Sequence, residues 1–146
     1  MRVAEVMSTA VEFIEADAPV SEAAALMGEL DVGALPVGSA TRLEGVVTDR
    51  DILYRLVARG LDPSTVKLRD IISVPVIVCR ETDTVQAAMD LMAANHIRRL
   101  AVETESGRIT GWLTMSDLSR KLLVESAPLQ AALVEVTGEG VPVAAS

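Results

Sequence analysis

One pattern of residues occurs twice along this chain of 146 residues. A shift of 65 positions brings the first half into register with the second, and the shift becomes 66 after one extra residue in the second half. The matched pairs include Ser8 with Ser73, Val11 with Val76, Thr48 with Thr114, and Asp51 with Asp117. Because a unit of about 60 residues buries too little apolar surface to be secure alone, the two copies should pack face to face.

The repeat divides the chain into four parts. Residues 1–60 form the first repeat, residues 61–67 a linker, residues 68–125 the second repeat, and residues 126–146 a C-terminal tail. In the tail, Leu129, Leu133 and Val136 follow a helical spacing, which is compatible with a short helix. We expect the end of the chain, from Gly138 onward, to be mobile.

Each repeat shows a mixed α/β pattern, in which strands and helices follow the order strand, helix, strand, strand, helix. In the first repeat the predicted elements are a strand at 11–15, a helix from 20 that ends at Gly33, strands at 34–37 and 43–47, and a helix from 48 to about 59. In the second repeat they are a strand at 76–79, a helix from 85 that ends at His96, strands at 99–103 and 108–113, and a helix from 114 to about 125. The predicted fold class is therefore α/β (α+β).

Composition and charge exclude several classes of protein. Hydrophobic residues make up 50% of the chain and aromatic residues only 2%, so the core must be aliphatic. A net charge of −8 argues against a nucleic-acid binder, which needs a basic face. One cysteine, Cys79, excludes an intrachain disulfide, and one histidine, His96, excludes a His-His zinc motif, so we expect no metal site. The sequence shows no signal peptide and no long apolar run, which predicts a cytoplasmic protein without a membrane partner.

The most informative local motif is a heptad at the start of the last helix of each repeat: GVVTDRD at 45–51 and GWLTMSD at 111–117. It has two interpretations. Thr and Asp three residues apart at a helix start can form a capping box, which needs no ligand. Alternatively, the free N–H groups of the helix start bind a phosphate while the Asp carboxylate accepts hydrogen bonds from a diol. Arg50 and the pair Arg98 and Arg99 could then supply charge-assisted phosphate contacts.

Three more pairs of segments recur at matching places: VAEVMSTAV with LRDIISVPV, VSEAAALM with VQAAMDLM, and VGALPV with IRRLAV. Together with the heptads, they resemble the CBS domain, the module named after cystathionine beta-synthase, as a tandem pair. The resemblance covers about residues 1–125 and is strongest to small bacterial stand-alone CBS pairs. It implies two β-α-β-β-α repeats related by pseudo-twofold symmetry, and a flat homodimer.

The resemblance also implies a function. CBS pairs commonly act as regulatory modules that bind AMP, ADP, ATP or S-adenosylmethionine between the repeats, without catalysis and without a cofactor. In that family the motif Asp binds the ribose hydroxyls, whereas the motif Thr and a strand Arg contact phosphate. The nucleotide-binding candidates in this chain are therefore Thr48, Arg50, Asp51, Arg99, Thr114 and Asp117.

The two repeats differ at the strand arginine. Arg99 stands at this position in the second repeat, whereas the first repeat has Ala34, and Ala101 replaces the family's proline in the second repeat. We therefore expect a nucleotide to depend more on Thr114, Asp117 and Arg99 than on the first heptad. Arg50, inside the first heptad, could replace the missing strand arginine.

Two functions remain open at this point. One is a regulatory module that binds an adenine nucleotide, and the other is a structural or docking module that binds an unidentified regulated protein and no small molecule. An enzyme is disfavoured, because the sequence shows no Ser-His-Asp, Cys-His or paired-carboxylate arrangement. Calorimetric titration with adenine nucleotides would distinguish the two.

Overall fold

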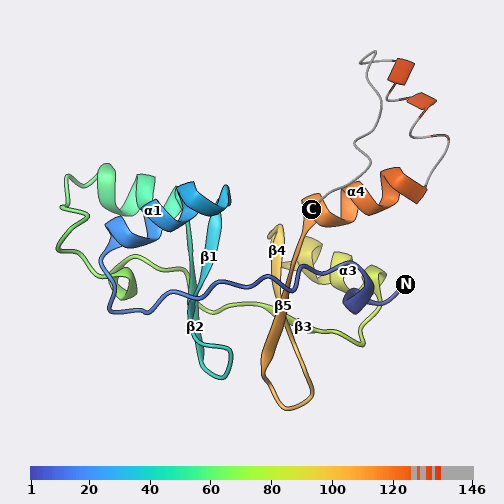
Figure 1. Ribbon diagram of the computed structural model, residues 1–146, viewed down its shortest axis with the longest axis horizontal. Coiled ribbons are helices and arrows are strands. Elements are labelled where there is room, and N and C mark those ends of the chain that lie inside the picture. The colour runs from blue at the N-terminus through green and yellow to red at the C-terminus, as the bar shows by residue number, and fades with distance from the viewer. Residues whose placement is uncertain (126–127, 129–130, 133, 136–146) are drawn as a thin grey trace.

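The computed structural model describes residues 1–125, 128, 131–132 and 134–135. Leu129, Leu133 and Val136, which suggested a tail helix, and the end from Gly138 onward lie outside the described residues. Two α/β lobes lie side by side (Figure 1). The first lobe contains α1 (Val20–Leu30), β1 (Ala34–Gly38), β2 (Leu43–Thr48) and α2 (Asp49–Ile52). The second contains β3 (Val78–Arg80), α3 (Val85–Asn95), β4 (Arg99–Glu103), β5 (Ile109–Thr114) and α4 (Met115–Glu125).

Each lobe is built on an antiparallel hairpin with the same register. Strand β1 pairs with β2, and β4 pairs with β5, so that Leu35 faces Val47 and Leu100 faces Leu113. All four of these side chains are buried. In the second lobe β3 adds a third strand, parallel to β4. The mixed α/β fold predicted from the sequence is confirmed.

The strand predicted at residues 11–15 is wrong, and the reason is a proline. Only Ile14 pairs with β1: its N–H donates to the Pro36 carbonyl at 3.1 Å and its own carbonyl accepts from Gly38 at 2.8 Å. The next ladder bond would need an N–H on Pro36, which proline lacks. In the second repeat Ala101 stands at this place, and its N–H donates to the Ile77 carbonyl at 3.3 Å. The substitution that departs from the family pattern thus explains why β3 forms and its counterpart does not.

Two predicted helices also differ in detail. The first ends before Gly33, because Asp31 adopts the left-handed conformation (φ 54°) just after Leu30; His96 does the same after α3, as expected (φ 53°). The helix predicted at 48–59 is α-helical only to Ile52 and continues as a π-helical turn, η2 (Leu53–Val57).

The π-helical turn places neighbouring apolar residues of this helix in different environments. The Ala58 N–H donates to the Leu53 carbonyl, five residues back, at 2.9 Å. Leu56 is consequently buried, whereas Leu53 and Val57 are 52% and 59% exposed. The end of the first repeat therefore presents apolar side chains to solvent.

Each lobe is completed by a segment that belongs to the other repeat. The N-terminal turn η1 (Val3–Glu5) lies against the second lobe (Figure 1), where the Val3 side chain is fully buried beside Leu100 and Leu118. The Val3 N–H donates to the Asp83 carbonyl at 2.9 Å. Cores of such small lobes depend on each buried side chain, so η1 is part of the second lobe's packing.

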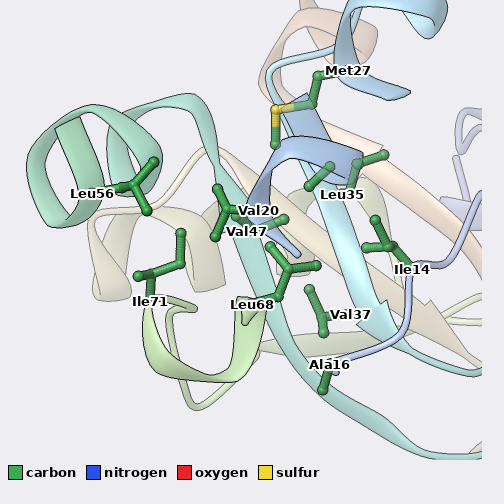
Figure 2. Packing of buried hydrophobic residues seen from close by; sticks show 11 residues of the cluster. Ile14, Ala16, Val20, Met27, Leu35, Val37, Val47, Leu56, Leu68 and Ile71 are labelled. Carbon is green, nitrogen blue, oxygen red and sulfur yellow. The ribbon is translucent and has the colours of Figure 1, made fainter. Parts of the chain in front are cut away.

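The exchange is reciprocal. The turn η3 (Leu68–Asp70) opens the second repeat but lies in the first lobe. There the Leu68 N–H donates to the Ala18 carbonyl at 3.0 Å. Figure 2 shows Leu68 and Ile71 packed among buried side chains of the first lobe, including Val20, Val47 and Leu56. Neither lobe has a complete core without residues from the other repeat.

Candidate functional site

A cavity of about 610 Å³ lies between the two repeats. The first repeat contributes residues 30–36, from the end of α1 into β1. It also contributes Ser8, Ala10, Val11 and Glu12 from the crossing segment, which leads from η1 in the second lobe to the first lobe. The second repeat contributes Arg98, Arg99, Trp112, Thr114, Met115, Ser116, Asp117 and Arg120. Of the six sequence-predicted site residues, Arg99, Thr114 and Asp117 line this cavity, and Thr48, Arg50 and Asp51 do not.

The second heptad forms a capping box at the start of α4. The Asp117 N–H donates to Thr114 Oγ1, and the Thr114 N–H donates to Asp117 Oδ2, both at 3.1 Å. This uses one carboxylate oxygen of Asp117; the other, Oδ1, accepts a bond from Arg120 at 2.6 Å. The two sequence interpretations of the motif are compatible here, because Asp117 caps the helix and also lines the cavity.

The first heptad forms the same capping box but is enclosed. Asp51 Oδ2 accepts from the Thr48 N–H at 2.9 Å, and the Ser73 hydroxyl contacts Asp51 Oδ1 at 3.0 Å and Oδ2 at 3.2 Å. Asp51 is only 7% exposed, and Arg55 lies 3.8 Å from its Oδ1. Both oxygens are therefore engaged within the protein. Arg50 is exposed and lies over the Tyr54 ring, 5.6 Å from its centroid.

The glycines that open the heptads allow the backbone of a neighbouring segment to approach closely. A Cβ on Gly45 would lie 3.0 Å from the Ser73 carbonyl oxygen, and a Cβ on Gly111 would lie 3.1 Å from that of Ser8. Gly45 thus lets the segment around Ser73 approach β2, and Gly111 lets the segment around Ser8 approach β5; each segment comes from the other repeat. Ser73 uses this closeness to bond Asp51, whereas its counterpart Ser8 lines the cavity.

Charge in the cavity is divided between the repeats. Its three arginines, Arg98, Arg99 and Arg120, come from the second repeat together with one acid, Asp117, whereas the acids Glu12 and Asp31 come from the first. Arg99 extends over the loop after α1: a Cβ added to Gly33 would lie 3.4 Å from a guanidinium nitrogen of Arg99. An anionic group would therefore be favoured at the wall formed by the second repeat.

Sequence reasoning missed two residues of the cavity wall. Arg120 was not singled out, although its position three residues after Asp117 places both on one helix face. Trp112 was not singled out as a site residue either, yet it is half-buried and lines the cavity. The alternation of residues around Gly111 does not predict which side chains of β5 line the cavity.

The lone cysteine and histidine lie outside the cavity lining. Cys79 is buried in β3, and burial raises the pKa of its thiol to about 11, with Asp83 and Glu103 adding to the shift. A thiol with this pKa is protonated at neutral pH, which fits a packing role. Within the described part of the chain, no group of three His, Cys, Asp or Glu side chains could hold a metal, and no helix is long and apolar enough to span a bilayer.

Comparison with known proteins identifies the repeat unit. A family profile described as the CBS domain matches residues 3–58 and 68–124, so both repeats are matched almost in full. The chain belongs to the CBS domain family. Hypoxic response protein 1 of Mycobacterium tuberculosis is 32% identical over 119 residues, which span 81% of this chain and 82% of that protein. The resemblance inferred from the motifs is confirmed, and the protein contains a tandem pair of CBS domains.

Two solved structures show what similar CBS proteins do. The hexameric CBS-CP12 protein from bloom-forming cyanobacteria is 27% identical, with a TM-score of 0.74 over 93% of this chain and 81% of that one. The CBS domain pair of protein MJ0100, in complex with 5′-methylthioadenosine and S-adenosyl-L-methionine, is 21% identical, with a TM-score of 0.76 over 86% of this chain and 98% of that one. At that identity the second comparison establishes the shared fold.

Proposed function

We propose that this protein is a cytoplasmic, non-catalytic regulatory module that binds one adenine nucleotide, or a related adenosyl ligand, in the cavity between its CBS repeats. The observation that carries the proposal is the cavity of about 610 Å³, which gathers Thr114, Asp117 and Arg99 from the second repeat. Its volume lies in the usual range for small-molecule sites, about 300–1,000 Å³. The CBS pair of protein MJ0100, which has the same fold, was solved with two adenosyl ligands.

The cavity wall offers a partner for each part of such a ligand. Asp117 Oδ1, which lies outside the capping box and is contacted by Arg120, is the acceptor for the ribose hydroxyls. Phosphate can be held by Arg99 and by the start of α4 at Thr114, where helix N–H groups favour an anion. The side chain of Trp112 supplies apolar surface for the base.

Titration calorimetry with AMP, ADP, ATP, S-adenosylmethionine and NAD tests this function. We expect saturable heat for at least one adenine compound, with one ligand per chain, because Asp51 is enclosed by Thr48 and Ser73. The absence of heat with all five would favour the alternative, a CBS pair that only docks a partner protein.

Arg99 should contact phosphate and not ribose. We predict that Arg99→Ala weakens AMP binding about tenfold to a hundredfold, the loss expected for one charge-assisted contact. Adenosine, which has no phosphate, should bind as before. Arg50→Ala is the matched control, since Arg50 lies outside the cavity. Equal losses of AMP and adenosine in Arg99→Ala would show that Arg99 does not contact phosphate.

The exposed apolar side chains at the end of the first repeat support a homodimer as part of this proposal. Leu53, Tyr54, Val57 and Leu61 are 42–59% exposed and follow one another on η2 and the turn after it. Contiguous apolar surface of this kind marks interaction sites. The similar CBS-CP12 protein is itself an oligomer.

Light scattering checks the dimer. We expect a mass of twice the 15.5 kDa chain for the wild type and of one chain for Val57→Glu, because a buried unpaired carboxylate opposes association. Ser106→Glu adds the same charge at the exposed β4–β5 turn and should leave the dimer intact. A monomeric wild type at high protein concentration would contradict the prediction.

A further inference from the structure

Arg120 occupies the carboxylate that the proposed ligand needs. Its guanidinium donates to Asp117 Oδ1 at 2.6 Å, and both residues line the cavity. The Asp117 side chain is 18% exposed and that of Arg120 is 50% exposed, so the pair lies at the cavity surface and not in a closed core. Because Oδ2 is engaged in the capping box, Oδ1 is the oxygen left for a ribose hydroxyl, and Arg120 already donates to it.

The first repeat pairs its heptad Asp differently, because Arg55, four residues after Asp51, lies 3.8 Å from Asp51 Oδ1. Asp51 keeps the same capping box, and its Oδ1 accepts from the Ser73 hydroxyl at 3.0 Å. The position that corresponds to Arg120 is Tyr54, which is exposed and lies beneath Arg50. An arginine three residues after the Asp therefore occurs only in the repeat whose heptad lines the cavity.

We propose that Arg120 determines ligand specificity by exchanging one anionic partner for another. This proposal rests on the proposed function. When the ribose hydroxyls take Asp117 Oδ1, Arg120 leaves the carboxylate and binds an anionic group of the same ligand, such as a phosphate. A ligand with both a diol and a phosphate keeps Arg120 paired, whereas a neutral nucleoside leaves the guanidinium without an anion.

Arg120 differs in this respect from the other two arginines of the cavity. Arg98 and Arg99 flank the start of β4, and neither forms an ion pair with Asp117 in the described structure. They can attract phosphate but do not compete with the ribose. Removal of Arg120 should therefore change the affinities for AMP and adenosine in opposite directions, which loss of a simple phosphate contact would not do.

The test is calorimetric titration of AMP and of adenosine into wild-type protein, Arg120→Ala and Arg108→Ala. In Arg120→Ala we expect AMP to bind about tenfold or more weakly. Adenosine should bind about twofold to fivefold more tightly, the factor expected when a half-exposed ion pair no longer competes. Arg108→Ala removes the same charge at a position outside the cavity lining and should change neither affinity.

The other outcomes distinguish an error in the role of Arg120 from an error in the proposed function. If wild-type protein binds both ligands and Arg120→Ala weakens both or changes neither, the role of Arg120 is wrong while the proposed function stands. If no variant and no wild-type protein binds either ligand, the proposed function is wrong and this role with it. Circular dichroism of each variant shows whether α4 and the rest of the fold are retained.

Discussion

Replacement of Leu68 by alanine should lower the free energy of unfolding by about 2–5 kcal/mol, the usual cost of removing a buried leucine side chain. Leu68 is fully buried in the first lobe, although it belongs to the turn that opens the second repeat. Because each lobe contains a segment from the other, we expect one cooperative unfolding transition for both lobes. Val3→Ala, which affects the other lobe, should lower the midpoint of the same transition.

Denaturant unfolding followed by circular dichroism measures this effect. Leu122→Ala is the control, because Leu122 is 46% exposed and its truncation should change stability by less than about 0.5 kcal/mol. Two separate transitions in Leu68→Ala, with the second lobe unaffected, would show that the lobes unfold independently and that the exchanged segments do not couple them.

The two heptad aspartates should have opposite roles. We expect Asp117→Ala to weaken both AMP and adenosine at least about tenfold, because both compounds carry the ribose diol that Asp117 would bind. We expect Asp51→Ala to leave both affinities unchanged and to destabilise the fold. Without the Asp51 carboxylate, the part-buried Thr48 N–H and Ser73 hydroxyl lose their acceptor. An unsatisfied buried group costs about 1–3 kcal/mol.

Calorimetry and denaturant unfolding on the same two variants test this division. Asp51→Asn is a useful companion, since it keeps the size of the side chain and one acceptor oxygen. If Asp51→Ala lost ligand binding but kept the wild-type free energy of unfolding, the first heptad would be part of the ligand site. Unchanged binding in Asp117→Ala would leave Thr114 and Asp117 as a helix cap only.

The internal repeat made the hairpins, the main helices and the two capping boxes predictable. Apart from β3, the helices and strands of one repeat have counterparts in the other because their apolar positions coincide. The strand at 11–15 could not be predicted from that equivalence, since its partner strand contains Pro36, which cannot donate the next hydrogen bond. A difference of one residue, Pro36 against Ala101, thus decides whether a third strand forms.

The candidate site was predictable in part for a similar reason. The contrast between Arg99 and Ala34 led us to favour the second repeat, and Arg99, Thr114 and Asp117 do line one cavity. The sequence did not indicate that Ser73 would enclose Asp51 while Ser8 would not enclose Asp117, because the two serines are equivalent in the repeat. Equivalence in sequence does not determine which crossing segment comes within hydrogen-bonding distance.

The exchanged segments also set an order for folding during synthesis on the ribosome. Arg2 donates a hydrogen bond to the carbonyl of Thr82, 80 residues further along the chain. Val3 packs against Leu118, so its site exists only once nearly the whole second lobe has emerged. Contacts between such distant residues slow folding. The segment around Val3 is therefore translated early and fixed late in the fold, and a nascent chain that stalls before α4 exposes this segment to chaperones and proteases.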